Sequence, residues 1–169
     1  MTNNQPERIE YGFQATMCSC QACVRHCEQV SGFLVPEDLP RWRHYFEVSE
    51  NIRLAHVLLA SPGALVGNRD GHTFRINTLV PDRQQNGMCV FLNSANRCMI
   101  HPLSPFGCKF FDGHMSDLEA QTRSHTGLMA VLNDWNKRGP YSSLWHQLYE
   151  LDRIAKPPEV ARGLIKQGK

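Results

Sequence analysis

Residues 18–27 read CSCQACVRHC and hold four of the seven cysteines in the chain. Gaps of two and three residues separate Cys20, Cys23 and Cys27. Thiolates at positions i and i+3 can reach one metal from a single turn, so little loop-closure entropy opposes binding. We therefore expect this segment to wrap around a metal, with the rest of the chain organised around it.

Three further cysteines, Cys89, Cys98 and Cys108, are more widely spaced. Aromatic and small residues surround them in the sequence, and these either shield a cluster from water or form ordinary core: Phe91, Phe106, Gly107, Phe110 and Phe111. A structural zinc ion takes four N or S ligands, and a [4Fe–4S] cluster usually takes four thiolates. The surplus of thiols favours two sites, or one cluster with a redox-active or structural pair.

Composition narrows the class of protein. A chain of 169 residues is predicted to form a single domain, residues 1–169, which buries a core without disulfides. The net charge is only +2, with acids and bases interspersed, and no run of eighteen apolar residues occurs, so neither nucleic acid nor membrane is an expected partner. Residues 1–8 lack the apolar stretch of a secretory signal. We therefore expect the reducing cytoplasm, where clustered thiols indicate metal or redox chemistry.

Periodicity predicts the elements of the first two thirds of the chain. Proline and acidic residues at 36–38 predict the start of a helix that runs to about Phe46, and apolar spacing predicts a second helix over residues 50–59. Alternating residues 73–80 predict a strand, followed by a turn at 84–87 and a returning strand at 89–92.

Prolines and a glycine predict an irregular loop over residues 102–107, and the pattern after Ser116 becomes helical. One helix is expected to end at Gly139-Pro140 and to be lined by Leu118, Leu128, Val131, Leu132 and Trp135. A last helix, ended by Pro157-Pro158, is expected to be lined by Leu144, Leu148, Leu151 and Ile154. The predicted fold is α-rich (α+β), a small irregular cysteine-cluster metal-binding domain with a short β element. Its metal-binding core spans residues 18–112 and its C-terminal helical extension spans residues 116–156.

The order of these motifs resembles a known family. The matching pattern is Cys20-x2-Cys23-x3-Cys27, followed by Pro36-Glu37-Asp38-Leu39, then Gly87-x-Cys89-x-Phe91-Leu92, then Cys98-x-Ile100-His101-x3-Pro105-x2-Cys108. It is similar to the YkgJ-type cysteine-cluster proteins, which are zinc- or iron-chelating domains, and it covers about residues 18–112. The resemblance implies a metal or cofactor site whose ligands come from Cys20, Cys23, Cys27, Cys89, Cys98 and Cys108.

The chain departs from the family pattern at two positions. His26 stands where the family often has the first of two adjacent cysteines, so either His26 or the additional Cys18 is a candidate for the missing ligand. Ser104 stands where the family usually has arginine before the proline. His101 is a further candidate ligand, with a surface or supporting position as the alternative.

A separate polar site is one interpretation of the residues that follow Cys108. It would combine Cys108 with Asp112 and His114, and the start of a helix is the alternative interpretation. The spacing of the residues leaves this choice open.

The leading functional hypothesis is an iron–sulfur protein. Zinc ribbons pair close-spaced cysteines at both ends, whereas here the second group is separated by eight and nine residues. We expect Cys20, Cys23, Cys27 and at least one later cysteine to hold a cluster, of the [4Fe–4S] type by ligand count, for electron transfer or cluster-dependent chemistry on a redox or client protein partner. The alternatives are a structural zinc module that binds a protein through its C-terminal helices, and a metallochaperone or metal sensor.

Overall fold

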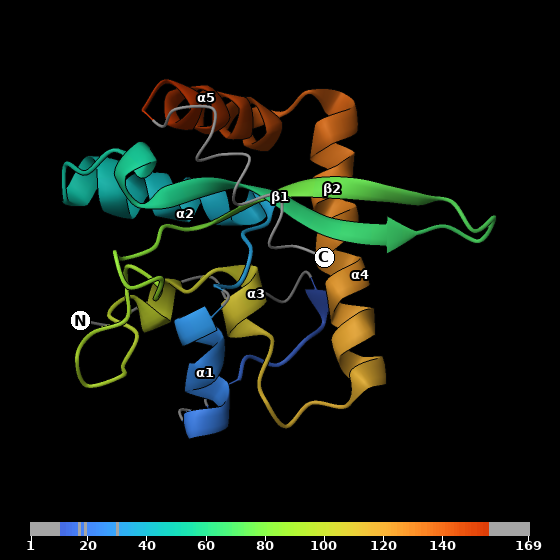
Figure 1. Ribbon diagram of the computed structural model, residues 1–169, viewed down its shortest axis with the longest axis horizontal. Helices are drawn as coiled ribbons and strands as arrows, with labels where there is room; N and C mark the ends of the chain where they lie inside the picture. Colours follow the sequence, from blue (N-terminus) through green and yellow to red (C-terminus); the bar gives the residue numbers. More distant parts are fainter. Residues whose placement is uncertain (1–10, 17, 19, 30, 156–169) are drawn as a thin grey trace.

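The computed structural model describes residues 11–16, 18, 20–29 and 31–155, and it shows a helix-rich α+β fold (Figure 1). The helices are α1 (Gln21–Gln29), α2 (Leu39–Trp42), α3 (Phe106–Lys109), α4 (Asp117–Lys137) and α5 (Pro140–Ala155). Strands β1 (Leu58–Gly67) and β2 (Thr73–Pro81) form an antiparallel hairpin. Helices α4 and α5 pack against this hairpin, while α1 and α3 lie beyond it on the opposite side from α5 (Figure 1).

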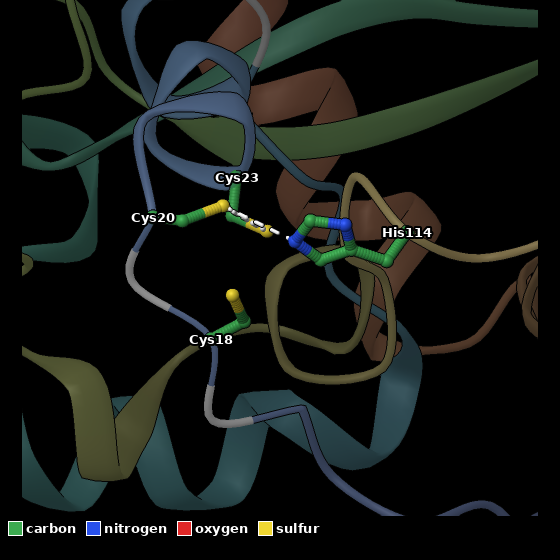
Figure 2. Close-up of side chains that lie close together, drawn as sticks. All are labelled: Cys18, Cys20, Cys23 and His114. Carbon is green, nitrogen blue, oxygen red and sulfur yellow. Dashed lines mark hydrogen bonds between the residues drawn. The ribbon is translucent and has the colours of Figure 1, made fainter.

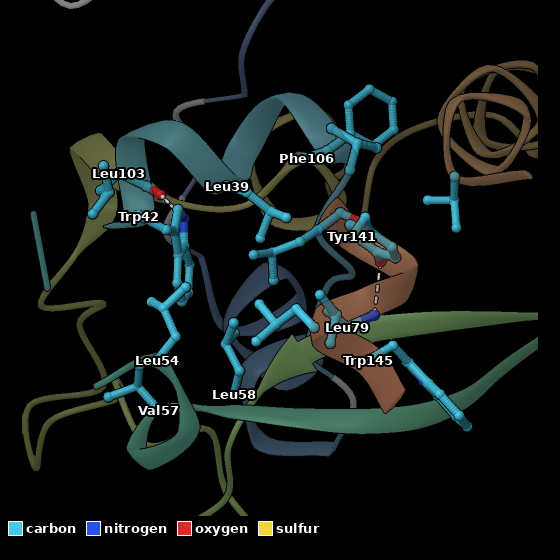
Figure 3. Packing of buried hydrophobic residues seen from close by; sticks show 14 of the residues in the cluster. Leu39, Trp42, Leu54, Val57, Leu58, Leu79, Leu103, Phe106, Tyr141 and Trp145 are labelled. Carbon is cyan, nitrogen blue, oxygen red and sulfur yellow. Dashed lines mark hydrogen bonds between the residues drawn. The ribbon is translucent and has the colours of Figure 1, made fainter. Parts of the chain in front are cut away.

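The predicted helix after Val35 is confirmed and is longer than expected. A 3₁₀ turn at Pro36–Asp38 leads into α2, and a π-helical segment, Arg43–Ser49, continues it. Proline suits the first turn because its missing N–H would have no helical partner there. Trp42 is fully buried and its indole Nε1 donates to the carbonyl oxygen of Leu103 at 3.0 Å (Figure 3). This bond joins the helical segment to the chain that precedes α3.

The helix predicted over residues 50–59 is wrong. A single 3₁₀ turn, Leu54–His56, occupies this stretch, and the chain then enters β1. Ile52, one of the apolar residues in the predicted helix, is 36% exposed. Pairing with β2 outweighs the weak local helical pattern, and the register runs from Leu58 opposite Pro81 to Gly67 opposite Thr73. The register shifts between Ser61 and Ala64, so the Pro62-Gly63 dipeptide forms a bulge within β1.

The predicted strand over residues 73–80 is confirmed as β2, and the turn at 84–87 is confirmed by the bond from Gly87 N to Gln84 O at 2.9 Å. The returning strand at 89–92 is wrong, because Cys89 and Leu92 make only isolated bridges to Arg83 and Cys98. The partner of β2 is β1 instead.

The irregular loop expected at 102–107 contains two short helical elements, a 3₁₀ turn at His101–Leu103 and the start of α3. Proline is compatible with both because Pro102 lies in the first turn and Pro105 precedes α3 as its N-cap. The prolines therefore begin helical turns here rather than excluding them.

The two C-terminal helices are confirmed. Ser116 caps α4 by accepting a hydrogen bond from Glu119 N at 3.3 Å, and the C-cap of α4 is Arg138, which is left-handed with φ 51°. Two of the expected lining residues face solvent instead, because Leu118 is 76% and Leu151 is 53% exposed. The packed faces hold Leu128, Val131, Leu144 and Leu148. Pro157 and Pro158 lie outside the described residues.

Tyr141, at the start of α5, fastens the core. Its fully buried hydroxyl donates to the carbonyl oxygen of Leu34 and accepts from the backbone N–H of Leu79, both at 2.7 Å (Figure 3). Leu34 N in turn donates to Leu79 O at 2.8 Å. One side chain thus ties α5 to β2 and to the segment that follows α1. Among the described residues no helix combines the length and apolar character needed to cross a membrane.

Candidate metal centre

Cys18, Cys20, Cys23 and His114 bring their donor atoms within 4.8 Å of one another (Figure 2). The Sγ atoms of Cys20 and Cys23 are 3.7 Å apart, and Cys20 Sγ is 3.2 Å from His114 Nε2. The three cysteines precede or begin α1, whereas the histidine lies between α3 and α4, 94 residues after Cys20. We call these four residues the cysteine–histidine group.

Helix α1 and the loop that follows α3 position this group. Val24 N donates to Cys20 O at 3.0 Å, which places Cys20 and Cys23 on one helical turn. On the loop, Gly113 N donates to Cys23 Sγ at 3.2 Å and His114 N donates to the carboxylate of Asp112 at 2.8 Å.

Gly113 allows the loop to approach α1 closely. A Cβ atom at this position would lie 3.2 Å from the Cβ of Ala22 and 3.3 Å from its carbonyl carbon. The absence of a side chain therefore leaves room for the backbone N–H of Gly113 to reach the sulfur of Cys23.

The thiols of the group have opposed protonation tendencies. The backbone N–H of Cys23 and a hydrogen bond with His114 lower the pKa of Cys20 to about 6. Desolvation, followed by the neighbouring Cys18 and Cys20, raises the pKa of Cys23 to about 11. Neighbouring thiolates repel one another, which disfavours their ionisation. A divalent cation offsets this repulsion, so a thiol that coordinates it loses its proton.

The spacing of the donors matches a single tetrahedral ion. A Zn–S bond of about 2.3 Å places two sulfurs of a tetrahedral site roughly 3.8 Å apart, and the Cys20–Cys23 separation is 3.7 Å. An iron–sulfur cubane binds each thiolate on a different iron, which spreads the sulfurs over the width of the cluster. The separation of the Cys20 and Cys23 sulfurs is therefore compatible with ligation of one tetrahedral ion.

The remaining four cysteines gather separately. Cys89 N donates to Cys27 O at 3.0 Å, and Gly32 N donates to Cys108 Sγ at 3.3 Å. Burial, followed by the nearby Cys89 and Cys98 thiols, raises the pKa of Cys27 to about 11. Burial likewise raises the pKa of Cys108, as do the thiols of Cys27, Cys89 and Cys98. We call Cys27, Cys89, Cys98 and Cys108 the four-cysteine group.

The six cysteines of the predicted ligand set thus fall in two places. Cys20 and Cys23 lie with Cys18, a lower-ranked candidate in the sequence, whereas Cys27 lies with the three later cysteines. His26 and His101 are exposed and are not members of the cysteine–histidine group.

The sequence did not predict the neighbour of His114. One of its two open interpretations linked His114 to Cys108 and Asp112 in a polar site, and the structure places the ring of His114 beside Cys20 (Figure 2). The local sequence indicates only that His114 follows a glycine and precedes the N-cap of α4. The spacing of the cysteines does not predict that His114 lies beside Cys20.

Comparison with protein-family models, with curated protein sequences and with solved structures found no match. The class of protein is therefore defined by the fold and the site alone. It is a helix-rich α+β protein whose cysteine–histidine group could hold a metal ion.

Proposed function

We propose that this protein binds one zinc ion through Cys18, Cys20, Cys23 and His114. The observation that supports this most directly is the convergence of three sulfurs and one imidazole nitrogen within 4.8 Å. Three cysteines and one histidine are an established ligand set of structural zinc, which prefers four N or S donors in tetrahedral geometry. The resemblance to YkgJ-type zinc- or iron-chelating domains is consistent with this proposal.

The bound ion would hold α1 in place. Helix α1 has nine residues, and none of the residues Gln21–Gln29 is buried. A helix of this length is marginal by itself in water, and its contacts with the core come from the partly buried side chains of Val24 and Cys27. An ion shared by α1 and His114 adds a further attachment, so its binding free energy contributes to local folding.

The position of the group favours a metal that exchanges with solvent. Cys18, Cys20 and His114 are all exposed. Such exposure supports a zinc-stabilised interaction module or a metallochaperone over a sealed catalytic centre. The expected compartment is the reducing cytoplasm, because the proposal requires free thiols.

Electron transfer through an iron–sulfur cluster is a second candidate function. The observation that favours it is the separate four-cysteine group, whose ligands are all thiols. A redox or client protein would then be the partner.

The test compares two histidines. His114→Ala should remove one zinc per chain and weaken binding by more than the roughly 10–100-fold typical of losing an outer-shell partner. His114→Cys should restore binding because it supplies a fourth thiolate. His26→Ala is the matched control, since His26 is exposed and lies on the same helix as Cys23.

Zinc content is measured on protein purified without oxygen, together with the spectrum of the cobalt-substituted protein. Loss of zinc in His26→Ala with full retention in His114→Ala would overturn the assignment. Equal zinc in all four proteins would do the same.

A further inference from the structure

The Cys20–Cys23 pair has the geometry of a redox-active dithiol as well as that of two metal ligands. The Sγ atoms of these two residues are 3.7 Å apart, and both cysteines are free. We propose that a low-molecular-weight disulfide oxidises this pair to an intramolecular disulfide, and that this oxidation releases the metal ion from the cysteine–histidine group. The switch rests on the zinc site proposed above, to which it adds a mode of regulation and a class of oxidant.

The backbone around the pair already permits a disulfide. The bond from Val24 N to Cys20 O at 3.0 Å shows that residues 20–24 form one helical turn. Positions i and i+3 of such a turn have Cα atoms about 5 Å apart, which lies inside the range of about 4.4–6.8 Å that a disulfide spans. The two sulfurs must approach from 3.7 Å to about 2.05 Å. Rotation of the two side chains achieves this without moving α1.

Exposure decides which sulfur reacts first. The side chain of Cys20 is exposed, whereas Cys23 is half-buried and accepts a hydrogen bond from Gly113 N at 3.2 Å. Access to the attacking sulfur governs the rate of thiol–disulfide exchange. Cys20 is therefore the residue that attacks the oxidant, and Cys23 is the residue that resolves the mixed disulfide. Cys18 is also exposed and is the competing partner that the experiment must distinguish.

The exchange consists of two balanced displacements. The Cys20 thiolate attacks one sulfur of the small disulfide RSSR, which forms the Cys20–SR bond, breaks the RS–SR bond and expels RS⁻. The Cys23 thiolate then attacks the Cys20 sulfur, which forms the Cys20–Cys23 bond and expels the second RS⁻. The pair of cysteines loses two electrons, and the small disulfide gains them. Both cysteines react as thiolates, the form in which they would also bind a metal, so neither displacement transfers a proton.

Oxidation of the pair removes two of the four proposed ligands. A structural zinc site takes four N or S donors, and its sulfur donors are thiolates. Cys18 and His114 by themselves leave such a site half empty, and the sulfurs of a disulfide are no longer thiolates. The oxidised group therefore loses its affinity for the ion, and reduction of the disulfide restores it.

The experiment uses the full chain, purified without oxygen, loaded with zinc and then treated with oxidised glutathione. A weak chromogenic chelator records the zinc that is released, with an untreated sample as the baseline. Differential alkylation followed by peptide mass spectrometry identifies the oxidised cysteines. We expect two of the seven thiols to be lost first, those of Cys20 and Cys23, together with the zinc. Dithiothreitol and fresh zinc should restore both.

Two variants separate this proposal from the zinc proposal. Cys18→Ser removes a proposed ligand but neither member of the pair, so it should lose zinc and still form the Cys20–Cys23 disulfide. Cys98→Ser is the matched control, because Cys98 is not a member of the cysteine–histidine group. It should match the wild type in both zinc release and disulfide formation.

Three results would overturn the switch. These are Cys20 and Cys23 that stay reduced while other thiols react, a wild-type disulfide that joins Cys18 to either of them, and zinc that stays bound after the Cys20–Cys23 disulfide has formed. Wild-type protein that binds no zinc would instead refute the zinc site, and the cysteine mapping would still decide whether the pair is redox-active. All of these results come from the wild-type protein, so they do not depend on the folding of a variant.

Discussion

Replacing Gly32 by alanine tests how closely the backbone of α3 must approach the segment after α1. Ordinary van der Waals contact of a Cβ begins at about 3.4 Å, whereas the new atom would lie 2.1 Å from the carbonyl carbon of Gly107. Both neighbours are backbone, so α3 must move by more than an ångström. That movement breaks the bond from Gly107 N to Phe33 O and displaces fully buried Phe106.

The expected loss of stability follows from these contacts. Overpacking a core costs about 1–3 kcal/mol, and a broken backbone hydrogen bond adds about 1 kcal/mol. We therefore expect Gly32→Ala to lower the free energy of unfolding by about 2–4 kcal/mol. It should also displace the sulfur of Cys108, which accepts from Gly32 N, because Cys108 moves with Gly107.

Urea unfolding followed by far-UV circular dichroism measures the free energy of unfolding. Gly67→Ala is the matched control, because a Cβ at Gly67 would meet nothing within 4 Å. It should change stability by no more than about 0.5 kcal/mol. A Gly32→Ala variant as stable as the Gly67→Ala control would refute the reasoning.

Three further predictions concern the core, the pH dependence of zinc binding and α1. Tyr141→Phe leaves the N–H of Leu79 and the carbonyl of Leu34 without their buried partner, so the free energy of unfolding should fall by about 2–4 kcal/mol. Thermal and urea denaturation measure this change. A change below about 0.5 kcal/mol would contradict these two hydrogen bonds. Zinc affinity should rise with pH across the neutral range, because Cys23, whose pKa is about 11, must release a proton to bind the ion. Cys20, with a pKa of about 6, makes the affinity depend on pH only under acidic conditions. Competition titrations with a chromogenic chelator at several pH values check this, and a flat profile would count against ligation by Cys23. Removal of zinc should raise the rate of amide hydrogen exchange in α1 while the amides of β1 and β2 stay protected. Hydrogen-exchange mass spectrometry measures these rates. An unchanged rate in α1 would mean that packing alone holds this helix.

The sequence predicted correctly those helices and strands whose apolar spacing matches the face that is buried in the fold. Leu39, Trp42 and Phe46 share a helical face in the sequence and are buried together in the structure. The helix predicted over residues 50–59 was wrong because its weak helical spacing competes with the pairing of β1 and β2. This pairing connects residues distant in the chain. Leu118 fits the period of α4 but lies in its first turn, where it is exposed to solvent.

Cysteine spacing located the thiols but not their division between two groups. Cys23 and Cys27 are neighbours on α1, and only the tertiary positions of their partners assign them to different groups. His114 enters through the loop before α4, a placement set by the packing of Gly113 on Ala22. Such a contact between distant segments leaves no periodic trace in the sequence.

The Pro62-Gly63 bulge also bears on how the chain behaves at high concentration. A two-stranded ribbon presents unpaired N–H and C=O groups along its edges, and another chain can extend such a ladder. Pro62 has no N–H to offer, and the bulge interrupts the register between Ser61 and Ala64. Gly63, at φ +67°, is fixed as glycine because a Cβ would lie 1.8 Å from Ile76 O. The hairpin thus carries an interruption in the middle of β1 that limits its growth into an intermolecular sheet.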